Sequence, residues 1–142
     1  SKFDECKQFS DRLGLKNVLF YGRRPIEEMP EYYSTADAML VTLKDNKFLS
    51  YTLPAKVQSY MAAGKPIIGS IDGETKRVIE DANCGFCCQA EDYKGLAEII
   101  LKFCMSENKE QMALNAKKYY DKNFSKGHFL ATLEQALFSL KQ

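Results

Sequence analysis

The sequence has little of what marks several common protein classes. Its 142 residues include no tryptophan and one histidine, and 20 basic residues nearly balance 19 acidic ones, for a net charge of +1. Such a balance gives no long-range field that would attract nucleic acid, so we expect no nucleic-acid partner. No apolar run approaches the roughly 18 residues that a membrane span needs, and the first residues lack the layout of a signal peptide. We therefore expect a cytoplasmic protein.

The sequence also lacks the cysteine pattern of a disulfide-stabilised protein. Its five cysteines are odd in number and unevenly spaced, which indicates reduced thiols. Cys84 and Cys87 form a C-x-x-C pair, but a redox or zinc site needs a helix N-terminus or a second pair of ligands. This pair lies instead in a run typical of a strand. We expect buried thiols there and no metal site.

The clearest local pattern that is present is a helix, a stop and a buried strand within residues 53–70. Pro54 suits the first helical position, because its missing N–H costs nothing there. Gly64 can take the left-handed conformation that ends helices, and Pro66 prevents the helix from continuing. The β-branched pair Ile67-Ile68 then predicts a short buried strand.

The same two kinds of pattern recur along the chain. Apolar runs bounded by turn residues predict further strands at 18–21, 38–43 and 86–89, and the polar residues 44–50 predict a loop. Helical spacing of apolar residues predicts helices at 4–13, near 30–36, from an Asp72 cap to about 83, and in three segments after residue 90, the last behind a Ser125 cap. Alternating helices and buried strands predict one Rossmann-like domain over residues 1–142. Its fold class would be three-layer α/β/α, with a mostly parallel sheet of about four strands and C-terminal helices.

Ligands of such sheets bind beyond the carboxyl ends of the strands. In this sequence those ends lead into residues 22–25, 44–54 and 70–74. The start of the helix at Pro54 therefore lies in the predicted ligand crevice.

Four landmarks occur along the chain in a characteristic order. They are GLKNVLFYG at 14–22, MPEYY at 29–33 followed by ADA at 36–38, PAK at 54–56 with YMAAGKPII at 60–68, and NCGF at 83–86. From about Leu13 to about Phe124 the sequence thus resembles the C-terminal, nucleotide-sugar-binding domain of retaining GT-B glycosyltransferases, especially family-4 enzymes that build bacterial surface polysaccharides. The resemblance implies transfer of a sugar, of the hexosyltransferase type and with retention, from a nucleoside-diphosphate-sugar to a glycan or polyprenyl-linked acceptor. It implies no required metal and no other cofactor.

The resemblance also implies a donor site built largely from backbone groups. The nucleobase would lie against the backbone of Gly22 and Arg23. The ribose and diphosphate would lie near the amides of Tyr51, Thr52 and Leu53. The family's catalytic residues belong to another domain, so we assign none in this sequence.

Two side chains of the predicted helix complete the candidate site. Lys56, in the first turn, is a candidate phosphate contact, because a bound phosphate would offset its conflict with the helix dipole. The family carries a pair of acidic residues whose positions correspond here to Tyr51 and Ser59. A serine can still bond a ribose hydroxyl, but more weakly than a carboxylate does, by about 1 kcal/mol.

The family's domain begins two strand–helix units before the point that corresponds to Ser1, and its acceptor-binding domain lies further upstream. We therefore expect a fragment that is inactive alone, from a protein peripheral at the inner membrane face. The strand at 18–21 would lack its usual neighbour, which leaves a rearranged sheet order, an exposed edge, or pairing between chains to form a dimer. Two other functions stay open, a non-catalytic glycosyltransferase-like binding module and a GT-B sugar-nucleotide epimerase.

Overall fold

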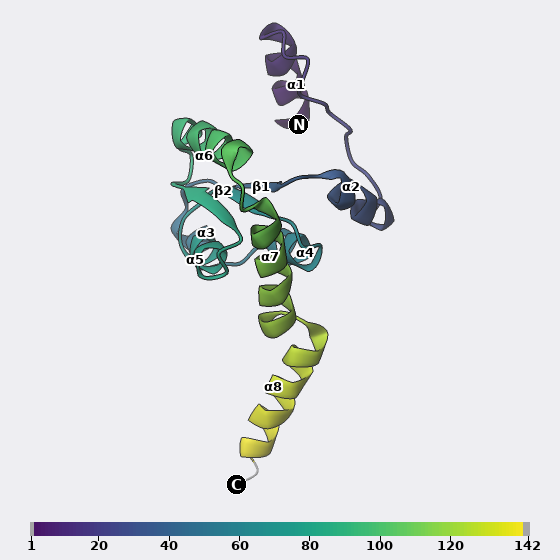
Figure 1. Ribbon diagram of the computed structural model, residues 1–142, viewed down its shortest axis with the longest axis vertical. Helices are drawn as coiled ribbons and strands as arrows, with labels where there is room; N and C mark the ends of the chain where they lie inside the picture. Colours follow the sequence, from purple (N-terminus) through teal and green to yellow (C-terminus); the bar gives the residue numbers. More distant parts are fainter. Residues whose placement is uncertain (1, 141–142) are drawn as a thin grey trace. The chain divides into compact units, whose positions relative to one another are not determined.

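The structure, a computed structural model, describes residues 2–140. The chain divides between Tyr32 and Tyr33 into two compact units, and each is described by itself. The first contains α1 (Lys2–Arg12) and η1 (Ile26–Glu28), and α2 (Met29–Thr35) includes the division. The second continues with β1 (Met39–Thr42), α3 (Lys47–Ser50), α4 (Ala55–Ala62), β2 (Ile67–Ser70), α5 (Glu74–Asp81), β3 (Gly85–Cys88), α6 (Tyr93–Met105), α7 (Lys109–Asn123) and α8 (Lys126–Ser139) (Figure 1).

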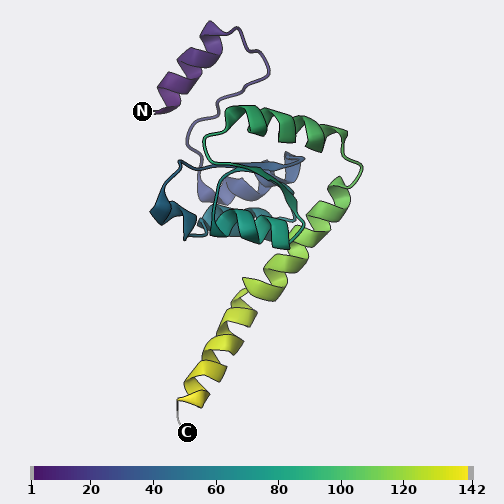
Figure 2. The ribbon, with the colours of Figure 1, turned by 90° about the vertical axis from the view of Figure 1, so that its left-hand side faces the viewer.

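The second unit is built on a parallel sheet with the order β1-β2-β3. Each strand pairs with the one before it, so right-handed crossovers place the connecting helices α4 and α5 on the same face. Helix α6 follows the last strand and covers the opposite face (Figure 2). The predicted α/β class, with a parallel sheet between helical layers, is thus confirmed, although the described sheet has three strands instead of about four.

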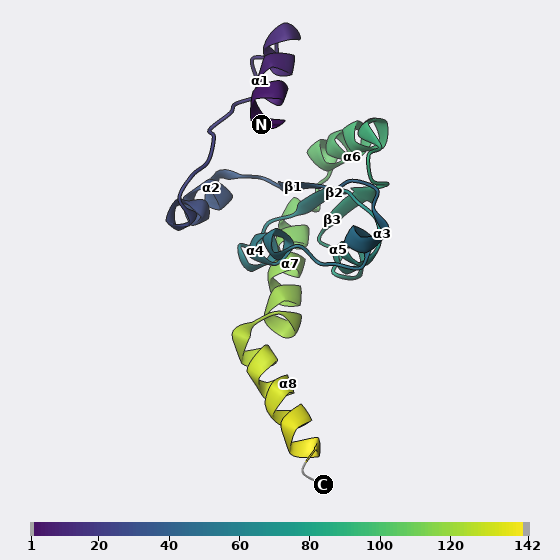
Figure 3. The same cartoon turned by 180° about the vertical axis from the view of Figure 1, so that it is seen from behind.

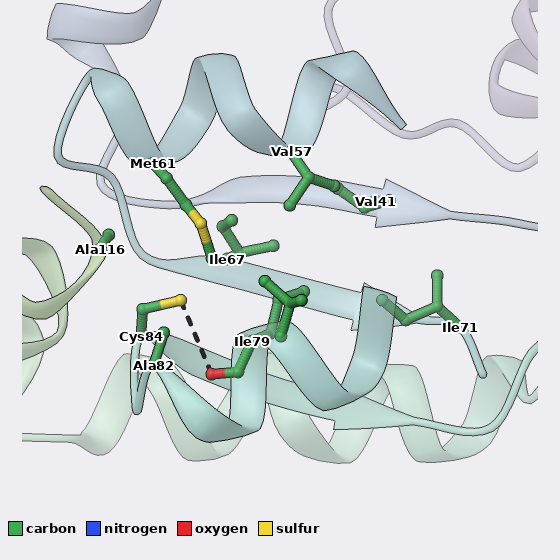
Figure 4. Close-up of a cluster of buried hydrophobic side chains, with 10 residues drawn as sticks. Val41, Val57, Met61, Ile67, Ile71, Ile79, Ala82, Cys84 and Ala116 are labelled. Carbon is green, nitrogen blue, oxygen red and sulfur yellow. Dashed lines mark hydrogen bonds between the residues drawn. The ribbon is translucent and has the colours of Figure 1, made fainter. Parts of the chain in front are cut away.

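The core of the second unit lies between the sheet and its helices. Val57 and Met61 of α4 point toward Val41 of β1 and Ile67 of β2, and Ile79 of α5 joins them from its own helix (Figure 4). All five side chains have an exposed fraction of 0%. The i, i+4 spacing of the two α4 residues explains why one face of this helix is buried.

The end of α4 is formed as the sequence predicts. Gly64 has φ +64°, the left-handed conformation that stops a helix. Here α7 lies alongside α4 (Figure 3), and the position of a Cβ on Gly64 would be 3.7 Å from the carbonyl oxygen of Ala113. At its other end α4 begins at Ala55, with Pro54 as the N-cap, one residue later than predicted.

The predicted strand at 18–21 is wrong. These residues are irregular, and Leu19 and Tyr21 are 68% and 56% exposed. An apolar run forms a strand only where its N–H and C=O groups pair with a neighbouring strand, and within the described residues of the first unit this run has no such partner. Its aromatic side chains make local contacts instead, with Phe20 edge-to-face on Phe3 at 5.6 Å between ring centroids. Pairing between chains stays a prediction.

Two smaller differences concern the loops. The stretch 44–50 is not all loop, because α3 occupies its second half, with the Asn46 side chain accepting a hydrogen bond from the Phe48 amide at 2.8 Å. Asparagine is a favoured N-cap, so this short helix has a local cause. Strand β3 spans 85–88 instead of 86–89.

Helix α8 begins at the predicted cap, where Ser125 Oγ accepts a hydrogen bond from the His128 amide. Its apolar side chains, Phe129, Leu133 and Leu137 among them, are exposed. Among the described residues, no helix combines the length and the apolar character needed to cross a bilayer.

Removing a core side chain tests this packing against a chemically matched control. Met61 is fully buried and Met105 is 80% exposed. Met61→Ala should lower the free energy of unfolding by about 2–5 kcal/mol, since it leaves a cavity, whereas Met105→Ala should change it by less than about 0.5 kcal/mol. Urea denaturation measures both values, and similar losses for the two variants would contradict the described core.

Candidate functional site

The three parallel strands end at one edge of the sheet, and a cavity lies there. β1 ends at Thr42, β2 at Ser70 and β3 at Cys88. The cavity has a volume of about 300 Å³ and is lined by side chains that include Lys44, Ser70, Glu91 and Tyr93. The carboxyl-end edge is where ligands of such sheets bind. Of the loops predicted to form the ligand crevice, this cavity includes Lys44 and Ser70, whereas Leu53 and Lys56 at the start of α4 are not part of its lining.

Two of the predicted donor amides are already bonded within the chain. The Tyr51 amide donates to the Phe48 carbonyl at 3.4 Å, and the Thr52 amide donates to the Leu49 carbonyl at 3.1 Å. Both bonds close the last turn of α3. Tyr51 itself is 74% exposed.

The start of α4 leaves other amides open. Among the described residues, those of Leu53, Ala55 and Lys56 have no hydrogen-bond partner within the chain, and no side chain caps the helix. Unpaired N–H groups and the helix dipole together favour an anion at this point. The exposed side chain of Lys56 adds a positive charge in the first turn.

Helix α5 begins next to this loop. Thr75 is fully buried, and its hydroxyl donates to the Thr52 carbonyl at 2.9 Å. Gly73 has φ +70°, and a Cβ placed on it would lie 2.1 Å from the carbonyl oxygen of Ser50, so the turn before α5 is in backbone contact with the end of α3. Neither residue is predicted from the sequence to belong to the site. The Asp72-Gly73 dipeptide is a turn signal, but no signal in the sequence shows which loop packs against that turn.

The predicted cap of α5 is wrong. Gly73 occupies the N-cap position, without a side-chain bond to the helix. The Asp72 carboxylate instead accepts a hydrogen bond from the Ala90 amide at 3.0 Å, which joins the loop after β2 to the loop after β3. A carboxylate can accept a hydrogen bond from any amide N–H within reach, and here that amide belongs to the loop after β3.

The remaining predicted residues have different surroundings. Ser59 is exposed, and its hydroxyl donates to the Ala55 carbonyl at 3.2 Å, one turn earlier in α4. Gly22 and Arg23 are exposed residues of the first unit, where Gly22 has φ +71°. Of the predicted site residues, the structure therefore groups Tyr51, Thr52, Leu53, Lys56 and Ser59 on α4 and the loop before it.

A carboxylate at the start of α5 is also engaged. Glu74 and Arg77 form an ion pair with a 2.9 Å contact between Oε2 and Nε, and Arg77 also contacts Asp81 at 3.0 Å. The hydrogen bond from Arg77 holds the pKa of Glu74 below its usual value.

Burial makes two of the cysteine thiols poor ligands and nucleophiles. It raises the pKa of Cys84 and of Cys87 to about 12 in each case. Both therefore stay protonated near neutral pH, whereas metal binding and thiol exchange need the thiolate. Within residues 2–140, no cluster of three or more His, Cys, Asp or Glu side chains is arranged to hold a metal ion.

Comparison with known proteins decides the family. The family model of the group 1 glycosyl transferases matches residues 1–119, which is most of the chain. The chain belongs to this family. The glycosyl transferase chain is also similar to two curated bacterial proteins, which support the same assignment.

One relative is WbjE of Pseudomonas aeruginosa, named as a probable glycosyltransferase, which is 32% identical over 87 residues. This alignment covers 60% of the glycosyl transferase chain and 22% of WbjE. The other is TuaH of Bacillus subtilis (strain 168), named for glycosyl transfer in teichuronic acid biosynthesis. It is 31% identical over 62 residues, which are 44% of the chain and 16% of TuaH. The chain thus matches a minor part of each relative's length.

Thiol labelling tests the environment of the cysteines. At pH 8 a thiol reagent should modify the exposed Cys6 and Cys104 quickly, and the buried Cys84 and half-buried Cys87 very slowly, since this pH lies far below the pKa of both thiols. The labelling rate at Cys84 and Cys87 should rise with pH as the thiolate fraction grows. Mass spectrometry of digests locates the label, with fully unfolded protein as the control. Fast labelling of Cys84 in the folded protein would contradict the burial described here.

Proposed function

We propose that this chain is the donor-binding part of a glycosyltransferase. The whole enzyme would move a sugar, with retention, from a nucleoside-diphosphate-sugar to a glycan or polyprenyl-linked acceptor. One observation carries the proposal: the start of α4, at the carboxyl-end edge of the sheet, presents unpaired amides at Leu53, Ala55 and Lys56. This arrangement suits the diphosphate of the donor.

The chemistry of sugar transfer explains why such a site would matter. As the bond to the sugar breaks, negative charge develops on the departing diphosphate. Fixed N–H groups and a lysine next to that diphosphate stabilise the transition state more than the ground state, which is how binding groups accelerate a reaction. On this proposal Lys56 and the α4 amides supply the stabilisation, and no metal ion is needed.

The names of the two relatives bear on the product of the whole enzyme. WbjE is named as a probable glycosyltransferase, and TuaH is named for teichuronic acid biosynthesis, which favours a surface polysaccharide as the product. We propose that the whole protein works at the cytoplasmic face of the membrane, with its acceptor-binding and catalytic residues outside these 142 residues. On this basis the chain alone would bind the donor but not transfer sugar.

A second function has a specific observation in its favour. The family's two acidic positions hold Tyr51 and Ser59, and the Ser59 hydroxyl already donates to the Ala55 carbonyl. Without a charged acceptor for the ribose hydroxyls, the chain would be a glycosyltransferase-like binding module without catalysis.

Calorimetric titration with uridine diphosphate and guanosine diphosphate tests the proposed donor site. One of the two should bind, and Lys56→Ala should weaken it about fivefold, because an exposed lysine adds a modest charge interaction. Lys118→Ala removes an equal charge from an exposed position on α7 and should leave the affinity unchanged. Binding should persist in EDTA. Absence of binding by the folded chain would count against the proposal.

Restoring an acid separates the two functions. Ser59→Glu should change the affinity of the nucleoside diphosphate by no more than about threefold if the wild-type site is a working donor site, because other contacts already hold the ligand. If the wild-type chain binds nothing and Ser59→Glu binds, the non-catalytic module is supported instead. The same titration measures both proteins.

A further inference from the structure

At the carboxyl-end edge, the turn before α5 packs through backbone atoms against the end of α3. Gly73, just before α5, has φ +70°, and a Cβ at this position would lie 2.1 Å from the Ser50 carbonyl oxygen. Any other residue type would require this turn or the end of α3 to move. The start of α5 therefore has a fixed position against the end of α3, from which the chain runs into the loop before α4.

A buried hydrogen bond also joins α5 to the loop before α4. Thr75 has an exposed fraction of 0%, and its Oγ1 donates to the carbonyl oxygen of Thr52 at 2.9 Å. A buried hydroxyl without a partner would be costly, so this bond is maintained in the folded protein. It fixes the direction in which the Thr52 carbonyl points.

Because the peptide bond is planar, the direction of the Thr52 carbonyl also sets the direction of the next N–H group. The Thr52 carbonyl and the Leu53 N–H belong to one trans peptide unit, so the two groups point to opposite sides. While Thr75 holds the carbonyl toward α5, the Leu53 N–H must point away from α5. Among the described residues, this amide has no hydrogen-bond partner.

Within the described residues, the Thr75 hydroxyl is the group that hydrogen-bonds this peptide. Pro54 is the N-cap, it has no N–H, and no side chain caps the helix. The bonds of the Tyr51 and Thr52 amides run back to α3. The Leu53 side chain packs against the core, and the bond from Thr75 fixes the direction of the peptide before it.

We infer that Thr75 is a positioning residue for donor binding, whose hydroxyl holds the Thr52–Leu53 peptide so that the Leu53 amide faces the donor's ribose and diphosphate. The inference rests on the proposed function of this edge. Thr75 itself does not touch the donor. It acts through the peptide that it orients.

Three variants test this role. Thr75→Val keeps the shape but removes the hydroxyl, Thr75→Ser keeps the hydroxyl, and Ile79→Val trims a buried residue of the same helix and serves as a matched stability control. In calorimetry, Thr75→Val should bind the nucleoside diphosphate that the wild type binds about tenfold more weakly, and Thr75→Ser should bind it within about twofold of wild type. Ile79→Val should lower stability without changing this affinity. An unchanged affinity for Thr75→Val, or an equal loss for Ile79→Val, would overturn the inference.

An amide signal separates this inference from the proposed function. In ¹H–¹⁵N spectra without ligand, the Leu53 signal should move in Thr75→Val and stay in place in Thr75→Ser and Ile79→Val. If it does not move in Thr75→Val, Thr75 does not orient this peptide and the inference fails. If wild type binds neither uridine nor guanosine diphosphate, the proposed function fails, and with it the ligand-facing role of Thr75. Should Thr75→Val not fold, Thr75→Cys, a weaker donor of similar size, takes its place in both measurements.

Discussion

The pairing of β2 with a parallel strand on each side is the constraint on which the second unit depends. β2 is buried along all four of its residues, and its register with β1 and β3 aligns the three strand ends. Because the strands are parallel, the chain must return along a face of the sheet between one strand and the next, and here it does so through α4 and α5. The loops that follow the strands therefore gather at one edge, where the cavity and the start of α4 lie.

At the start of α4 the chain offers a ligand backbone groups more than charged side chains. Two carboxylates near it bond to protein groups: Glu74 pairs with Arg77, and Asp72 accepts from the Ala90 amide. The helix start itself presents amides that are unpaired within the described residues, and the side chain of Lys56. Such a site favours an anion because its dipoles are fixed by the fold. This preference, together with membership of the group 1 glycosyl transferases, is the basis of the proposal that the chain binds the sugar donor.

Local signals in the sequence were enough to predict most elements of the second unit. Gly64 and Pro66 marked the end of α4, and Ser125 marked the start of α8, because helix ends depend on one or two residues. The run at 18–21 predicts a strand that the structure does not contain, since a strand also needs a partner that a local pattern does not reveal. The roles of Gly73 and Thr75 could not be predicted for the same reason. Each depends on a residue more than twenty positions away, Ser50 or Thr52.

The central claim is that the donor's diphosphate binds at the start of α4. Mapping ¹H–¹⁵N amide shifts during a titration of the chain with uridine or guanosine diphosphate tests it most directly. If the diphosphate binds there, the largest shifts will occur at the amides of Leu53, Ala55 and Lys56, whose N–H groups are unpaired within the described residues. Saturable shifts confined to other parts of the sheet or to α8, with these three amides unmoved, would contradict it.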